Sequence, residues 1–269
     1  MTDAQALTDD VSWYHTFRLP DGTLTPGYID TVDEVGRVPL PESLSGKRCL
    51  DVGTCDGFWA IEMAKRGGDV VAIDLPDARA WDWPGRATEA NRVEAQTHLD
   101  GRRRAFAIAC ETFGVEVDRR DTSVYDASRE ELGAFDFIFI GSLLLHLRDP
   151  VGALAALRRV ADGQLLSVDA VSPLLTALHP RQPVARLEAP DWPLWWGINL
   201  AGYRHMFTAA GWVSEDTGRV FFQRMGPGFT LRGDAARDAG RSPTWVLRQQ
   251  LQKRLGILHS WVLARPGQP

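Results

Sequence analysis

The sequence predicts an α/β fold in which helices cover both faces of a largely parallel sheet, a doubly wound arrangement. Three observations predict it. Short apolar runs alternate with longer amphipathic stretches along most of the chain, which is typical of β–α–β units. The run at 135–140 (FDFIFI) is almost entirely apolar, as expected for a strand inside a parallel sheet. A glycine-containing turn at 53–57 directly follows the first apolar run and precedes a helical pattern.

The expected elements follow that alternation. Strands are predicted at 48–52, 69–74, 115–119, 135–140 and 164–169, and helices at 58–66, 87–113 and 150–160. Gly67-Gly68 and Gly114 end two of these helices, and Pro150 begins the third. Residues 1–45, rich in Pro, Gly and Asp, are predicted to form an N-terminal cap, so that the main domain covers 46–269.

The regular alternation of strand and helix patterns stops after residue 169. Residues 171–198 hold five prolines and a Trp-rich cluster, which predicts a loop-rich lid inserted after the fifth strand. A helix is predicted at 199–210, closing strands at 212–223 and 260–264, and a further helix at 241–255.

Composition limits the function classes. The length of 269 residues suits one large α/β domain, or one with an inserted cap. Three cysteines without a CxxC pair indicate a reducing cytoplasm and not a disulfide framework. The acidic first ten residues lack the apolar core of a signal peptide, and the apolar run at 135–147 is too short to span a bilayer. We therefore expect a cytoplasmic protein with no membrane association.

The net charge of −5 disfavours nucleic acid as a partner, because an acidic chain gains little non-specific attraction to phosphates. A local basic patch could override this. The short basic run at 102–104 is interpreted as a solvated helix face.

The turn Asp51-Val-Gly-Thr-Cys-Asp-Gly57 is the strongest motif. Glycines let the backbone turn tightly beside a ligand, and the helix that follows presents free N–H groups. A dinucleotide fingerprint, G-x-G-x-x-G, fails because its second and third glycines would be Cys55 and Phe58. The S-adenosylmethionine pattern, acid-x-G-x-G-x-G, departs only at Cys55. This pattern, with Thr54 inside it, predicts an S-adenosylmethionine site, and an ordinary strand-to-helix turn is the alternative.

Two later loops fit the same cofactor. Asp74 ends the second predicted strand, where nucleotide-binding folds place the carboxylate that accepts from both ribose hydroxyls. Leu75 follows it. The loop after the third strand offers Ser123 and Val124 for the adenine. Taken singly, each loop is also readable as a plain surface loop.

Further matching pieces run in order from about residue 28 to 213. They are 28–31 (YIDT), 50–53 (LDVG), 56–59 (DGFW), 71–74 (VAID), 135–138 (FDFI), 144–150 (LLHLRDP) and 209–212 (AAGW). With these pieces the chain resembles class I S-adenosylmethionine-dependent methyltransferases, and among them the group related to the tRNA wobble-uridine carboxymethyl-transferring enzymes. The resemblance implies a seven-stranded Rossmann-like methyltransferase fold. It also implies a cofactor site at Asp51, Gly53, Gly57, Asp74, Ser123, Val124, Gly141 and Ser142.

The chain departs from the tRNA group at positions which, in that group, help to hold a carboxylated cofactor. The group has a Trp and a Lys shortly before the first motif, and residues 32–38 contain neither. It has a Tyr before the His of the fourth-strand motif, where this chain has Leu145. The departures imply ordinary S-adenosylmethionine and put tRNA as substrate in doubt.

Methyl transfer requires the protein to align a nucleophile and, where needed, to remove its proton. His146, after the fourth strand, is a candidate general base, and Asp169, at the end of the fifth, could orient substrate. Both are equally readable as residues that order their loops. Trp195 and Trp196, with Trp192, could line an aromatic wall, and His15 could close the site from the cap. Lid packing and a cap anchor explain the same residues.

No metal is predicted, because the remaining histidines lack metal-ligand spacing. The resulting hypothesis is an S-adenosylmethionine-dependent methyltransferase that acts at O or N of a small molecule, in natural-product metabolism by analogy. Two alternatives stay open. One is methylation of RNA, namely the tRNA wobble uridine. The other is a non-catalytic cofactor-binding regulator, which Cys55 in a glycine position would suit. A homodimer is left open.

Overall fold

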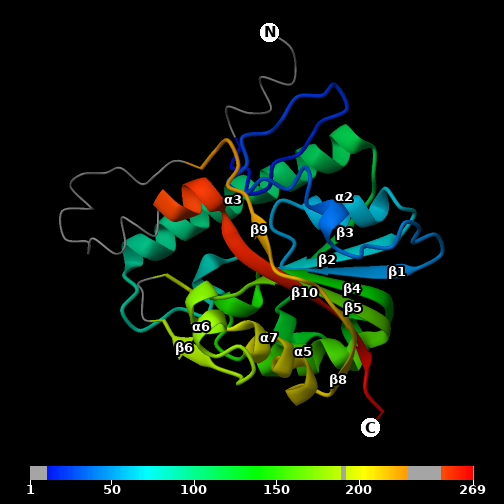
Figure 1. The fold of residues 1–269 in the computed structure, drawn as a ribbon. Helices are drawn as coiled ribbons and strands as arrows, with labels where there is room; N and C mark the ends of the chain where they lie inside the picture. Colours follow the sequence, from blue (N-terminus) through cyan, green and yellow to red (C-terminus); the bar gives the residue numbers. More distant parts are fainter. Residues whose placement is uncertain (1–10, 189–191, 230–249, 269) are drawn as a thin grey trace.

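A computed structural model describes residues 11–188, 192–229 and 250–268. At its centre lies an eight-stranded sheet in the order β3-β2-β1-β4-β5-β10-β8, with β9 paired to β10 (Figure 1). The strands of this sheet are β1 (Arg48–Val52), β2 (Asp69–Asp74), β3 (Asp118–Asp121), β4 (Phe135–Gly141), β5 (Ala161–Ala170), β8 (Trp212–Thr217), β9 (Phe221–Gln223) and β10 (Ile257–Pro266).

The direction of the strands positions the site. The first five strands are parallel, whereas β10 runs antiparallel to β5, β8 and β9. From β1 the sheet grows to one side with β2 and β3, and the chain then crosses back to add β4 and β5 on the other side of β1. In open α/β sheets, ligands bind outside the carboxyl ends of the strands at such a switch point.

Helices cover both faces, which confirms the predicted doubly wound fold (Figure 1). The α-helices are α2 (Phe58–Ala64), α3 (Glu89–Phe113), α4 (Arg129–Leu132), α5 (Pro150–Val160), α6 (Pro173–Leu178) and α7 (Leu200–Ala209). Short 3-10 helices are η1 (Val35–Arg37), η2 (Ala78–Ala80), η3 (Val124–Asp126) and η4 (Leu144–His146). Because side chains alternate across a strand, Cys49 packs with α2 and α3, and Leu50 packs with α5 and α7.

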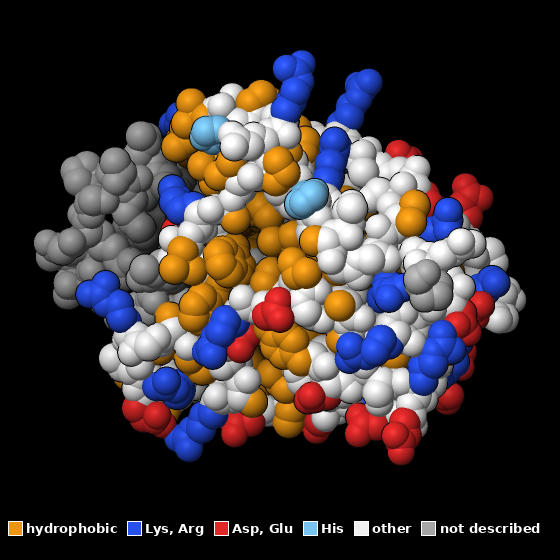
Figure 2. Space-filling view, turned by 90° about the horizontal axis from the view of Figure 1, so that it is seen from below, with side chains coloured by type: hydrophobic (Ala, Val, Ile, Leu, Met, Phe, Trp, Pro, Cys, Tyr) orange, Lys and Arg blue, Asp and Glu red, His pale blue; other side chains and the backbone are white. Residues whose placement is uncertain are grey.

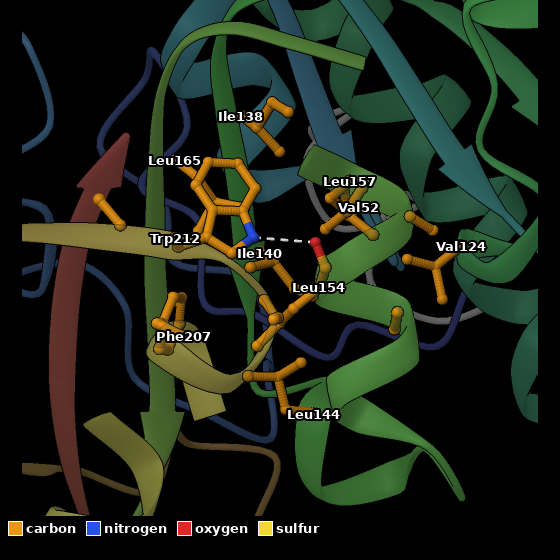
Figure 3. Packing of buried hydrophobic residues seen from close by; sticks show 14 of the residues in the cluster. Val52, Val124, Ile138, Ile140, Leu144, Leu154, Leu157, Leu165, Phe207 and Trp212 are labelled. Atoms are coloured by element: carbon orange, nitrogen blue, oxygen red, sulfur yellow. Dashed lines mark hydrogen bonds between the residues drawn. The ribbon is translucent and has the colours of Figure 1, made fainter. Parts of the chain in front are cut away.

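Trp212, at the start of β8, closes the core on the face of the sheet that α5 and α7 cover. Its side chain is buried among Leu157, Leu165 and Phe207, and its indole N–H donates to the Leu154 carbonyl in α5 at 2.8 Å (Figure 3). A buried indole N–H needs such a partner. This contact joins the final part of the fold to the helix that follows β4.

The N-terminal segment at 27–29 lies beside residues 225–228, which follow β9. Ile29 forms a bridge with Met225, and the Gly226 N–H donates to the Tyr28 carbonyl at 2.8 Å. Farther along, the Gly228 N–H donates to the Gly27 carbonyl at 2.9 Å. Segments nearly 200 positions apart in sequence therefore lie side by side.

Three predicted elements differ from the observed ones. The third strand lies at 118–121 and not at 115–119. The predicted strand 212–223 is two strands, because Gly218 between them packs so close to Trp261 that an added Cβ would lie 2.2 Å from the indole nitrogen. The lid contains α6 and a small antiparallel sheet of β6 (Ala185–Leu187) and β7 (Trp196–Ile198). Residues 250–255 are helical, and the remainder of the predicted helix 241–255 lies outside the described residues.

Candidate active site

A cavity of about 1010 Å³ opens at the carboxyl ends of β1, β2, β4 and β5. Eleven of the predicted site residues line it. They are His15, Asp51, Gly53, Thr54, Asp74, Leu75, Ser123, Val124, Gly141, Ser142 and His146. Gly57, Asp169, Trp195 and Trp196 are not among its lining residues. Cavities of this size hold ligands of several hundred Å³.

The turn after β1 forms the floor of the cavity. Gly53 adopts a left-handed backbone (φ +72), and its N–H donates to the Ile73 carbonyl at 2.9 Å. Cys55 is also left-handed (φ +56), although it carries a side chain. Burial raises the pKa of its thiol, which therefore stays protonated. The motif thus accommodates a small residue in the conformation that glycine normally supplies.

Gly57 has a different role from the one expected. It caps the N-terminus of α2 with φ +86, and an added Cβ would lie 2.5 Å from the ring of Phe106 in α3. The glycine is required by the close packing of helix against helix, and it does not line the cavity.

Asp74 links the ends of β1 and β2. Its Oδ2 accepts the Cys55 N–H at 3.0 Å, and its Oδ1 accepts the Leu75 N–H at 2.8 Å. Arg119 Nη2 lies 3.6 Å from Oδ2. Burial raises the pKa of Asp74, and the nearby Arg119 opposes that rise. Each carboxylate oxygen has two lone pairs, so Asp74 retains capacity to accept two hydroxyls.

Asp51 is a buried acid whose side chain suits a ligand group. Its side chain is 2% exposed, and its Oδ2 has no hydrogen-bond partner among the described residues. The buried Thr54 hydroxyl oxygen is in the same state. Burial raises the pKa of Asp51 to about 6. Unsatisfied buried polar atoms are costly, and a carboxyl with a facing hydroxyl suits the ammonium and carboxylate of an amino-acid moiety.

The other wall comes from the ends of β3 and β4. Ser123 caps η3, and Val124 is buried beside it. Ser142 adopts a left-handed backbone (φ +48), and its N–H donates to the Val168 carbonyl at 2.8 Å. This turn carries Gly141 and Ser142 across the mouth of the sheet and into the cavity wall.

His146 lies in η4 and faces the lid. Its Nδ1 is hydrogen-bonded to the Pro193 carbonyl. Because a carbonyl oxygen only accepts, Nδ1 carries the proton and the neutral ring has its lone pair on Nε2. Burial lowers the pKa of His146, so the imidazole is neutral near pH 7.

Asp169 orders the loop after β4 from outside the cavity. Its Oδ2 accepts the Leu144 N–H at 2.9 Å, and its Oδ1 accepts the Ala170 N–H at 2.7 Å. Burial raises its pKa to about 7. This carboxyl fixes η4, and hence His146, in place. Asp169 itself is not among the residues that line the cavity.

The tryptophans of the lid divide into two groups. Trp195 donates its indole N–H to the Asp82 carbonyl at 2.7 Å, and Trp196 donates to the Leu147 carbonyl at 3.0 Å. Both therefore fasten the lid to the loops beneath it. Trp192 lines the cavity with Trp81, and their rings meet edge to face at 6.1 Å. The aromatic wall consequently belongs to Trp192 and Trp81.

The N-terminal segment supplies the remaining wall. Tyr14 and Tyr28 stack at 6.0 Å, and both line the cavity with His15 and Glu34. Glu34 is 4% exposed and accepts a hydrogen bond from the Gln223 amide at 2.5 Å. Burial raises its pKa to about 7. Sequence reasoning missed Glu34 and Gln223, because they lie far apart in the chain with no motif around either.

Arg102 was also missed. The sequence interpretation placed it on a solvated helix face, but its guanidinium lies 4.9 Å from the Tyr14 ring and lines the cavity. The sequence did contain a signal that Arg102 lies on the buried face of its helix. Leu99, Arg102 and Phe106 are spaced three and four apart, so they share one face of α3, and both hydrophobic residues are buried.

Within residues 11–188, 192–229 and 250–268, the structure brings together no three metal-ligating side chains. None of the helices in these ranges has the length and hydrophobicity that a bilayer crossing requires. The prediction that no metal is used stays a prediction.

A parallel sheet with a cavity at the carboxyl ends of its strands is typical of proteins that bind a nucleotide cofactor, and comparison with known proteins identifies the family. Residues 27–218 match the family described as "Methyltransferase domain", so the chain belongs to this methyltransferase family. S-adenosylmethionine is its cofactor, as the turn after β1 predicts. The family is broader than the tRNA wobble-uridine group, and membership in it does not single that group out.

Individual relatives are more distant. A ubiquinone biosynthesis O-methyltransferase of Hahella chejuensis is 32% identical over 138 residues, which is 51% of this chain and 46% of that protein. The chain thus spans less than half the length of this curated relative. A protein of Bacillus halodurans assigned to the methyltransferases has a TM-score of 0.50 at 14% identity, covering 89% of this chain and 99% of its own. The [4+2]-cyclase SpnF has a TM-score of 0.50 at 15% identity, covering 84% and 78%. These two structures show the fold alone.

Proposed function

We propose that this protein transfers a methyl group from S-adenosylmethionine to an oxygen or nitrogen atom of a small molecule, in natural-product metabolism of the cytoplasm. One observation carries the proposal. The polar groups suited to the cofactor and the aromatic groups of the cap and lid line the same cavity. Such a cavity holds two ligands side by side, which is what direct transfer between them requires.

The half of the cavity at the ends of β1, β2 and β3 is suited to the cofactor. Asp74 receives the ribose hydroxyls, Asp51 and Thr54 the amino-acid end, and Ser123, Val124 and Leu75 the adenine. Gly53, Gly141 and Ser142 give the backbone room to approach. When bound, S-adenosylmethionine supplies an electrophilic methyl group on a positively charged sulfur, and no further activation of the methyl is required.

The acceptor half is bounded by Tyr14, Tyr28 and Phe229 on one side and by Trp192 on the other. Aromatic walls favour a flat or partly apolar acceptor. The relative named for ubiquinone biosynthesis is an O-methyltransferase, which supports oxygen as the acceptor atom. Three imidazoles line the cavity and could take up a proton, those of His15, His98 and His146.

The charge of the cavity supports a small molecule over RNA. Five carboxyl side chains line it (Glu34, Asp51, Asp74, Asp82 and Glu188), whereas Arg102 is the one Lys or Arg side chain among its described lining residues. Binding of a phosphate backbone needs the opposite balance. On the face drawn in Figure 2, hydrophobic side chains gather near the middle, and the coloured Lys and Arg side chains around them form no continuous strip.

The test has two steps. Isothermal titration should show saturable binding of S-adenosylmethionine. The protein is then incubated with cofactor carrying a radioactive methyl group and with either a small-molecule extract or total RNA. Label should enter the small-molecule fraction. Label in RNA would favour the tRNA alternative, and binding without transfer to either fraction would favour a regulator. Because the fold also hosts a protein named as a cyclase, the transfer step is decisive.

A further inference from the structure

His15 and Asp56 form a buried pair at the edge of the cavity. Asp56 lies in the turn between β1 and α2, and its side chain is fully buried. Its Oδ1 accepts from His15 Nδ1 at 2.5 Å, and its Oδ2 accepts the backbone N–H groups of Tyr14 and His15, each at 2.7 Å. One carboxylate therefore fixes both the backbone and the ring of His15.

This geometry sets the tautomer of His15. Since Asp56 accepts, Nδ1 carries the proton, and the neutral imidazole has its lone pair on Nε2. The ring is held flat against Phe58 at 5.4 Å, with the edge of Tyr14 beside it at 4.9 Å. The described residues provide no hydrogen-bond partner for Nε2, although the side chain is only 11% exposed and His15 lines the cavity.

Two other imidazoles line the cavity. The side chain of His98 is 41% exposed and lies 4.0 Å from the carboxyl of Glu94, which is itself 33% exposed, so this carboxylate is not a buried partner. His146 also lacks a comparable partner. Its Nδ1–H donates to the neutral carbonyl of Pro193, and burial lowers its pKa. A carbonyl dipole stabilises an imidazolium much less than a carboxylate does. A histidine whose Nδ1–H is held by a buried carboxylate is the arrangement that catalytic dyads and triads use for proton uptake.

We propose that His15, oriented by Asp56, is the general base of the methyl transfer, an inference that rests on the proposed function. The acceptor heteroatom forms a bond to the methyl carbon while the carbon–sulfur bond breaks, and that electron pair stays on sulfur. The proton of the acceptor passes to His15 Nε2 and then to solvent. Asp56 acts as a positioning residue, and His146 remains in the wall beneath the lid.

The charged groups around the ring are consistent with this role. Apart from Asp56, the carboxyls of Asp51 and Glu34 lie close enough to His15 for the imidazole to oppose the rise in their pKa values. These carboxyls come from β1 and from the cap. An imidazolium formed at His15 is thus surrounded by acidic groups from three segments of the chain.

The first test measures which ring nitrogen of His15 is protonated in the protein without cofactor or acceptor. Nitrogen-15 NMR of the wild-type protein without cofactor, recorded at alkaline pH, should show His15 with a protonated Nδ1 and an unprotonated Nε2. In Asp56→Asn, the preference for this tautomer should be lost. A wild-type His15 protonated at Nε2 would overturn the proposal.

The second test reads transfer to the labelled small-molecule fraction as a function of pH. His15→Gln should lower the transfer rate by on the order of 100-fold or more while S-adenosylmethionine still binds. It should also remove the fall in rate at low pH. Added imidazole should restore part of the rate of His15→Ala, which a purely structural histidine would not allow. The matched control His205→Gln, on the exposed side of α7, should behave as wild type.

The failures are distinguishable. A His15→Gln rate within about threefold of wild type would overturn the role of His15. A wild type that transfers no label contradicts the proposed function itself, and the tautomer measurement then still decides whether the pair is built as inferred.

Discussion

The carboxylate of Asp74, at the end of β2, accepts the backbone N–H of Cys55, in the turn after β1, at 3.0 Å. The two residues stand 19 positions apart, and each belongs to a separate motif. Their contact means that the carboxylate assigned to the ribose also fixes the turn assigned to the amino-acid end. The two halves of the cofactor site are therefore not independent.

Asp74→Asn should weaken S-adenosylmethionine binding by roughly 10- to 100-fold, because an amide nitrogen would face the N–H of either Cys55 or Leu75 and one acceptor for the ribose would be lost. Isothermal titration measures the change. Asp118→Asn, on the exposed end of β3, is the matched control and should bind as wild type. Equal affinity in both variants would remove Asp74 from the site.

Substitutions at Cys55 should show how much its side chain and its left-handed backbone each affect the stability of the fold. Cys55→Gly should change the free energy of unfolding by no more than about 1 kcal/mol, since relief of the left-handed strain and the greater entropy of unfolded glycine oppose each other. Cys55→Val should destabilise by about 2 kcal/mol or more, because β-branched residues rarely adopt positive φ. Urea unfolding measures both. A valine variant as stable as wild type would contradict the left-handed turn.

Glu34 should make the protein less stable as the pH rises. Its pKa is about 7 in the folded state against 4.5 ordinarily, so the folded state holds the proton more tightly. The resulting stability is fully present below about pH 4.5 and is lost as the pH rises through 7, by up to about 3 kcal/mol. Glu34→Gln keeps an oxygen for the Gln223 amide but cannot titrate. Its unfolding free energy should therefore fall less between pH 5 and pH 8, measured by urea unfolding. The exposed control Glu42→Gln should follow wild type, and identical slopes in all three proteins would refute the effect.

Trp212→Phe should destabilise the fold by about 2 kcal/mol, through a lost buried hydrogen bond to Leu154 and a residual cavity beside α5. Thermal and urea unfolding measure it. Phe222→Leu, at a site 42% exposed, should cost much less. Because Trp212 lies outside the cavity, S-adenosylmethionine affinity should be unchanged, and a loss of affinity would show that the core and the site are coupled.

Much of the fold was predictable because periodicity is a local property. Four of the five parallel strands and the helix at 150–160 lie close to their predicted positions. The third strand was misplaced because its observed residues, Asp118 to Asp121, are all polar. The division at Gly218 depends on Trp261, which is more than forty positions away.

The cofactor side of the cavity was predictable for the same reason, since Asp51 and Asp74 lie at the ends of their strands and Ser123 follows the third strand. The acceptor side was not. Glu34, Gln223 and Arg102 meet only after the cap, β9 and α3 have packed. Trp195 and Trp196 were sound candidates by residue type, but the direction of an indole N–H cannot be read from sequence, and both point to backbone carbonyls below the lid.

The position of β10 has a consequence for synthesis on the ribosome. Residues 257–266 are translated after every other strand of the sheet, yet they lie between β5 and β8. Until they emerge, the nascent chain presents two open strand edges, which readily pair with other chains. The sheet is therefore completed only after β10 has emerged from the ribosome, and chaperone demand during translation should be highest before that point.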